Sequence, residues 1–299
     1  MTEFLDMLSA FDIEFERSYD LSCCSSFRIG GPCDIAVFPK SEEELSLVIS
    51  KLKKSNIRFD VIGRGSNVLF ADEGYRGVIV FTKNMNEMFC NGTKIRALCG
   101  VKLSSLANLA RDNSLSGLEF AHGIPGSVGG AVTMNAGAFG GDIKSIVVNS
   151  RALDVGNGET MSIIGDENNF GYRRSVYTEN KNLICLSAEF ELEQGDIDEI
   201  NAKMRQNSTA RREKQPIELP SCGSFFKRPE GFFAGKLIED CGLKGFSVGG
   251  AQISQKHAGF IVNTGNATAR DVMDLGAIAE RVVFEKFGVK LEREVKYIG

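Results

Sequence analysis

The sequence lacks tryptophan and holds only two histidines, His122 and His257, among its 299 residues. So few histidines exclude a histidine-rich metal centre, and a Ser-His-Asp hydrolase would have to use one of these two. No apolar run approaches the ~20 residues that cross a bilayer, and Met1–Met7 lack the basic-then-apolar order of a secretory signal. We therefore expect a cytoplasmic protein with no resident metal and no membrane partner.

Net charge and cysteine usage further limit the class of protein to which the chain can belong. The formal net charge of −4 provides no basic field, so nucleic acid is not expected as a partner. Eight cysteines occur without a C-x-x-C pair or a histidine at metal spacing, a pattern typical of reduced thiols in a cytosolic chain. The chain is longer than a single compact hydrophobic core usually accommodates, so we predict two or three domains.

Alternating strand and helix patterns predict a mixed fold. Residues 34–38 and 57–62 have the pattern of strands, and Ser41 with Glu44 forms a capping box that begins a helix between them. Gly156-Asn-Gly158 is a strong hairpin signal. Further predicted elements are helices at 103–113, about 196–214 and about 268–287, hairpin strands at 147–155 and 160–164, and strands at 183–192 and 289–298.

The charged helix near residue 200 is interpreted as a connector between domains, because no core face is evident in it. We predict an N-terminal segment over 1–22, a first domain over 23–200 with subdomains of about 23–82 and 83–200, and a second domain over 201–299.

Two glycine-rich segments predict backbone that approaches phosphate. Gly63-Arg-Gly-Ser-Asn67 follows an apolar strand, and glycines there let N–H groups come close to an anion. In residues 121–131, Pro125-Gly126-Ser127 are suited to begin a helix whose first amides face a diphosphate. The alternatives are a tight turn for the first segment and a glycine-rich packing seam for the second. The two together favour a dinucleotide.

Single residues are weaker candidates. Arg173 offers a planar fork for carboxylate or phosphate, and Ser224 after a glycine is suited to present a hydroxyl. Cys222 is the rival of Ser224 as nucleophile or acid, although no nearby base is evident. Glu294 lies on one face of the final strand, and a solvated edge is its default interpretation.

Taken in order, seven segments resemble the UDP-N-acetylenolpyruvoylglucosamine reductase family, flavoproteins of peptidoglycan precursor synthesis. The resemblance fits the shorter subclass, which lacks an extra tyrosine-bearing loop. The segments are Ser26–Pro32, Ile62–Leu69, Gly123–Gly130, Tyr172-Arg173, Gly223–Lys227, His257–Asn263 and Leu291–Val295.

The resemblance implies an α+β fold: an FAD-binding domain of the vanillyl-alcohol-oxidase type with two α+β subdomains, then a smaller C-terminal α+β substrate domain. It implies that NADPH reduces a non-covalently bound FAD, which then reduces UDP-N-acetylglucosamine enolpyruvate to UDP-N-acetylmuramate. Cell wall biogenesis, cell shape and cell division would depend on this step, and the subunit is expected to be a monomer.

The resemblance also assigns residues to roles. Ser224 matches a proton donor, and Arg173 and Glu294 match a pair that stabilises charge on the substrate carboxylate. Tyr172, Lys227, Arg228 and His257 match substrate-binding positions, although many relatives carry asparagine where Arg228 stands. Expected cofactor contacts are Gly63, Arg64, Gly65, Ser66, Asn67, Gly123, Ile124, Pro125, Gly126, Ser127, Gly129, Gly130, Ala131, Ala136 and Gly137.

Two other classes stay open from the residues alone. One is a different FAD-dependent oxidase or dehydrogenase of the same flavin fold, with His122 or a nearby cysteine as a candidate for covalent flavin attachment. The other is a nucleotide-binding module without catalysis.

Overall fold

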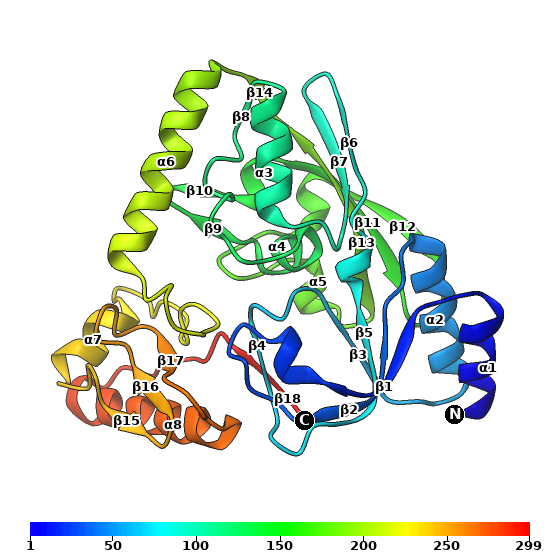
Figure 1. Ribbon diagram of the computed structural model, residues 1–299. Helices are drawn as coiled ribbons and strands as arrows, with labels where there is room; N and C mark the ends of the chain where they lie inside the picture. The colour runs from blue at the N-terminus through cyan, green and yellow to red at the C-terminus, as the bar shows by residue number, and fades with distance from the viewer. The chain divides into compact units, whose positions relative to one another are not determined.

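The computed structural model describes residues 1–299 and divides them into two compact units. Unit 1 comprises residues 1–16, 35–64 and 77–210, and unit 2 comprises 17–34, 65–76 and 211–299. Figure 1 follows the chain from its blue N-terminus to its red C-terminus. The helices are α1 (Thr2–Ala10), α2 (Glu42–Lys54), α3 (Leu103–Asp112), α4 (Val128–Met134), α5 (Val176–Glu179), α6 (Ile197–Lys214), α7 (Ala234–Asp240) and α8 (Ala269–Phe287).

An antiparallel five-stranded sheet forms the centre of unit 1, in the order β12-β11-β13-β7-β6. The predicted hairpin around Gly156-Asn-Gly158 is confirmed, since β11 pairs with β12 on either side of it. The predicted helix at 103–113 is confirmed as α3, whose apolar face is buried in the same core, and α4 packs against β7 and β13. The strands are β6 (Met88–Asn91), β7 (Lys94–Leu98), β11 (Val147–Asp154), β12 (Thr160–Ile164) and β13 (Leu183–Glu191).

A second sheet has the order β1-β2-β5-β3. β3 (Phe59–Ile62) runs parallel to β5 (Tyr75–Phe81), and α2 connects β2 (Pro32–Val37) to β3. The predicted cap of α2 is confirmed, because Ser41 Oγ accepts the Glu44 amide at 3.2 Å. β1 (Phe15–Asp20), β2 and β5 contain points where the chain passes between the units.

Unit 2 contains an antiparallel sheet of β15, β16 and β17 that packs with α7 and α8 around one core. The C-terminal strand β18 runs parallel to β4. The predicted final strand, 289–298, is shorter than expected, because the strand found there covers only Lys296–Ile298. These strands are β4 (Val68–Phe70), β15 (Ser247–Val248), β16 (Ala251–Ile253), β17 (Ile261–Asn263) and β18 (Lys296–Ile298).

Two further pairs of short strands are antiparallel: β8 (Leu115–Ser116) with β14 (Glu193–Gln194), and β9 (Gly137–Ala138) with β10 (Gly141–Asp142). No helix is both long enough and apolar enough to cross a membrane. No group of three or more His, Cys, Asp or Glu side chains is arranged to hold a metal ion.

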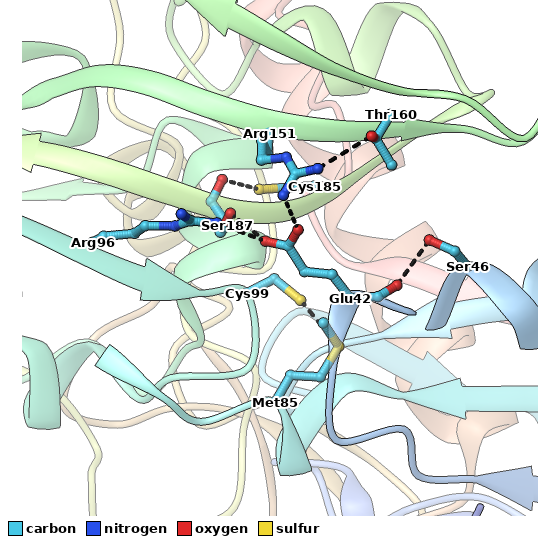
Figure 2. A network of polar contacts seen from close by, with 9 residues as sticks. All are labelled: Glu42, Ser46, Met85, Arg96, Cys99, Arg151, Thr160, Cys185 and Ser187. Carbon is cyan, nitrogen blue, oxygen red and sulfur yellow. Dashed lines mark hydrogen bonds and ion pairs between the residues drawn. The ribbon is translucent and has the colours of Figure 1, made fainter. Parts of the chain in front are cut away.

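A buried carboxylate ties α2 to the five-stranded sheet (Figure 2). Glu42, in the first turn of α2, is 7% exposed. It accepts hydrogen bonds from Arg151 of β11 at 2.6 Å, Ser187 of β13 at 2.7 Å and Arg96 of β7 at 3.3 Å. A buried carboxylate is costly unless it is paired. Glu42 must therefore stay bonded to these three donors, and the bonds hold α2 in place on the sheet.

Replacing Glu42 by Gln keeps the shape but leaves two guanidinium groups without their carboxylate. We expect the free energy of unfolding to fall by about 1–3 kcal/mol, measured by urea denaturation. The neighbouring Glu43 is exposed, so Glu43→Gln should change it by less than about 1 kcal/mol. Equal losses in the two variants would contradict the role given to Glu42.

Candidate functional site

The first glycine segment is a turn between β3 and β4. Gly65 has φ +63°, and a Cβ there would clash with the carbonyl oxygen of Cys24, so the position admits only glycine. The Ser26 amide donates to the Gly65 carbonyl at 3.0 Å, while the amides of Ser66 and Asn67 make no hydrogen bond within the chain. Two free N–H groups in succession are suited to an anion. Gly65, Ser66 and Asn67 belong to unit 2.

Gly63 and Arg64 belong to unit 1, where they meet the second glycine segment. A Cβ on Gly63 would clash with Ser127 Oγ, so the two segments touch at this point. Arg64 Nη2 donates to the Gly100 carbonyl at 3.4 Å, but its Nε is buried with no hydrogen-bond partner. A buried guanidinium N–H without an acceptor is costly, and an anionic ligand such as a diphosphate would satisfy it. These residues therefore fit a dinucleotide.

The second segment begins α4, as predicted, with Ser127 as its N-cap. The expectation that the first helical amides face a ligand is wrong, because the Val128 amide donates to Val101 at 2.9 Å and the Gly129 amide to Cys99 at 2.8 Å. The Gly130 amide is directed at Ser127 Oγ. The amides of His122, Gly123 and Ser127 make no hydrogen bond within the chain, so they are the donors left in this segment.

The other predicted cofactor contacts in unit 1 lie before, within and after α4. Ile124 packs against the core, and Ala131 is buried in it. The Ala136 amide donates to the Ala131 carbonyl at 2.9 Å, and Gly137 begins β9. Pro125 and Gly126 lie in the turn before α4, where Gly126 accepts from Leu103 at 3.1 Å. Their contacts with a cofactor stay a prediction.

The adjacent glycines of α4 have different surroundings. A Cβ on Gly129 would lie 2.7 Å from Cys99 Cβ, whereas one on Gly130 would meet nothing closer than 3.6 Å. In protein stripped of cofactor, we expect Gly129→Ala to lower the free energy of unfolding by about 1–3 kcal/mol. Gly130→Ala should leave it unchanged or raise it by up to about 1 kcal/mol. Thermal denaturation separates the two, and equal losses would contradict the close packing of Gly129.

Arg173 lies at the tip of a tight turn. Gly171 and Arg174 exchange two backbone hydrogen bonds, of 3.0 and 3.2 Å, and Arg173 has φ +54°. Its guanidinium carbon is 5.5 Å from the centre of the Tyr172 ring. The turn therefore presents a cation and an aromatic ring side by side.

Two side chains tie this turn to α4, and sequence reasoning missed both. Asn135, in the left-handed conformation that ends α4, donates from Nδ2 to the Gly171 carbonyl at 3.0 Å. Ser175 Oγ donates to the Thr133 carbonyl at 2.7 Å. An asparagine that ends a helix in this conformation is a recognisable signal. Arg173 is therefore held at the opposite end of α4 from Ser127.

Ser224 and Glu294 lie on paired segments of unit 2. The Glu294 amide donates to the carbonyl of Phe225, the residue after Ser224, at 2.9 Å. The Lys227 amide donates to the Glu292 carbonyl at 2.8 Å. Both Ser224 and Glu294 are half-buried. A hydroxyl and a carboxyl group thus share one hydrogen-bonded frame.

Cys222, the rival acid, is 5% exposed. Its thiol donates to the Val68 carbonyl at 3.2 Å, and burial raises its pKa to about 12. Such a thiol stays protonated and bonded inside the unit. The structure therefore gives Cys222 a packing role.

The predicted substrate-binding residues of unit 2 have different partners. Lys227 forms an ion pair with Glu292, and Arg228 lies 4.7 Å from the Phe233 ring centre. His257 Nδ1 accepts the Gly259 amide at 3.1 Å, and burial lowers the pKa of this imidazole. The neutral ring therefore carries its proton on Nε2 and offers a neutral donor. Tyr172, in unit 1, is 59% exposed.

Both histidines are expected to titrate below the ordinary value of 6.5. Burial is the main cause for His257 and His122. Just below pH 6.5 the unfolded chain then binds more protons than the folded chain. The free energy of unfolding should therefore fall as the pH decreases from 6.5 toward the lower pKa values of the folded state. NMR titration of imidazole signals, assigned with His257→Gln, measures the two pKa values. A value above 6.5 for His257 would contradict the neutral donor.

The class of protein is set first by the flavin fold. A family model described as "FAD binding domain" matches residues 33–163. The solved structure of Phl p 4.0202, a glucose dehydrogenase, has a TM-score of 0.51 at 15% identity, over 65% of this chain and 44% of that one. The chain thus has the fold of a vanillyl-alcohol-oxidase-type flavoprotein, and the predicted fold class is confirmed.

The family follows from closer relatives. The model described as "UDP-N-acetylenolpyruvoylglucosamine reductase, C-terminal domain" matches residues 215–298. The reductase of Clostridium novyi is 48% identical over 92% of this chain and 89% of its own. The crystal structure from Thermus caldophilus has a TM-score of 0.80 at 31% identity, over 96% of this chain and 99% of that one. The chain belongs to the UDP-N-acetylenolpyruvoylglucosamine reductase family.

Proposed function

We propose that this chain reduces UDP-N-acetylglucosamine enolpyruvate to UDP-N-acetylmuramate, with NADPH as the hydride source and a non-covalently bound FAD as carrier. The reaction is a step of peptidoglycan precursor synthesis. The observation that carries the proposal is the meeting of Gly63 with Ser127 beside the buried, unsatisfied Nε of Arg64. Closely approaching backbone beside the buried guanidinium of Arg64 suits the diphosphate of a flavin, in a family that acts on a nucleotide sugar.

The bound flavin would supply the chemistry of accepting and then giving a hydride. Arg64 would neutralise phosphate charge, and the amides of Gly123 and Ser127 would donate to phosphate oxygens. The amides of Ser66 and Asn67, from unit 2, are proposed to serve the same cofactor.

Arg173 is proposed to hold the substrate carboxylate. Hydride addition to the enolpyruvyl double bond builds negative charge toward that carboxylate, so a fixed guanidinium interacts more strongly as the barrier is crossed. The anchored turn at Gly171 supports this role, because a preorganised cation needs no rearrangement during reaction. Tyr172 beside it is proposed to contact substrate.

Ser224 is proposed to deliver the proton that completes the reduction, at the carbon next to the carboxylate. Glu294, on the paired segment, would supply a further proton-bearing group that stabilises the enolate-like state. The pairing of their segments supports joint action, since the Glu294 amide donates to the carbonyl of Phe225, the residue after Ser224. Lys227, Arg228 and His257 are proposed to bind the nucleotide sugar, with His257 as a neutral donor.

The remaining assignments are also proposals. We propose that residues 1–22 are an N-terminal segment, that 23–200 form the FAD-binding domain, and that 201–299 form the substrate-binding domain, with Tyr172 and Arg173 of the FAD-binding domain also reaching the substrate. NADPH and nucleotide sugars are cytoplasmic metabolites, which supports a cytoplasmic location. A monomer suffices for the reaction as described.

Replacing Ser224 by Ala should separate the two half-reactions. Flavin reduction by NADPH should stay within about twofold, whereas reoxidation by the enolpyruvyl sugar should slow by about 10²–10⁴-fold, the scale of a lost general acid. Anaerobic stopped-flow absorbance measures each half-reaction.

Cys222→Ala is the matched control, because it removes a neighbouring buried thiol with its pKa raised to about 12. It should leave both half-reactions nearly unchanged. Equal losses in both half-reactions for Ser224→Ala would refute its role as proton donor. A defect of Cys222→Ala confined to the reduction of the enolpyruvyl sugar would assign the proton-donor role to Cys222 instead.

A further inference from the structure

Asn67 brackets the segment that carries Glu294. Its side-chain Nδ2 donates to the Glu294 carbonyl at 3.1 Å, and its backbone carbonyl accepts the Lys296 amide at 3.0 Å. Directly afterwards, β4 and β18 pair in parallel from Val68 and Lys296 onward. The side chain of Asn67 thus extends the strand ladder by one hydrogen bond, toward Glu294.

Glu294 is consequently held from both of its backbone groups. Its amide donates to Phe225 at 2.9 Å, and its carbonyl accepts from Asn67. The first bond joins it to the segment of Ser224, and the second to the turn of Gly65 and Ser66. A residue fixed at both N–H and C=O has little freedom in its φ and ψ angles, so its side chain leaves the backbone in one direction.

We infer that Asn67 is a positioning residue for Glu294, rather than a side-chain ligand of the cofactor. Only its backbone amide, which has no hydrogen-bond partner within the chain, is left to face the flavin. The inference rests on the proposed function, because it gives Asn67 an effect on catalysis through Glu294. The side chain of Asn67 thereby links the proposed flavin turn to Glu294.

The test compares Asn67→Ala with Asn263→Ala. Both remove an asparagine whose Nδ2 donates to a backbone carbonyl within unit 2, at 3.1 Å to Glu294 and at 3.0 Å to Phe27. Each variant is purified with its flavin and examined alone and combined with Glu294→Gln.

Asn67→Ala should keep its FAD content and its rate of flavin reduction by NADPH, while kcat for the enolpyruvyl substrate falls roughly 5- to 10-fold, the scale of one net hydrogen bond. In the Glu294→Gln background, Asn67→Ala should cause no further loss, because its effect passes through Glu294. Whatever loss Asn263→Ala causes should multiply with that of Glu294→Gln.

Amide hydrogen exchange gives a readout that does not need the reaction. Asn67→Ala should speed exchange in residues 294–298 about fivefold, and Asn263→Ala should not. Lost FAD, a multiplicative effect with Glu294→Gln, or unchanged exchange in residues 294–298 would each overturn the inference. If the wild type fails to reduce the enolpyruvyl sugar, the proposed function fails, while the exchange experiment still tests whether Asn67 holds this segment.

Discussion

The seating of α4 on the segment from Cys99 to Val101 is the interaction on which the proposed site depends most. The amides of Val128 and Gly129 donate to that segment, and Gly129 leaves no room for a side chain against Cys99. This contact fixes the first turn of α4. Its N-terminal end then meets Gly63, and its C-terminal end holds the Arg173 turn. The proposed cofactor cradle and the proposed carboxylate-binding cation, Arg173, are thereby both positioned by one short helix.

Local patterns predicted the elements that local interactions decide. The cap of α2 at Ser41 and the hairpin at Gly156-Asn-Gly158 follow from hydrogen bonds within a few residues, and both are confirmed. The ordered motifs identified the family, and with it the FAD-binding fold. Pro125-Gly126-Ser127 was also predicted to begin a helix, and α4 begins there with Ser127, a preferred N-cap residue, as its N-cap.

Long-range contacts could not be predicted in this way. Glycine enrichment near Gly129 indicates close approach, but periodicity does not say whether a ligand or another strand comes close. Here the segment from Cys99 to Val101 comes close, and the amides of Val128 and Gly129 donate to it. The contact between Asn67 and Glu294 joins residues more than two hundred positions apart, and unit 2 is assembled from three separate stretches. Such pairings leave no trace in one sequence, because neither residue type demands the other.

The visible spectrum of the purified protein tests the central claim most directly, because a flavin held by the two glycine segments absorbs where the chain itself does not. The account predicts the absorption bands of oxidised flavin, their bleaching when NADPH is added without oxygen, and release of the flavin from the chain on denaturation. A well-folded, colourless protein that takes up no added FAD would contradict it.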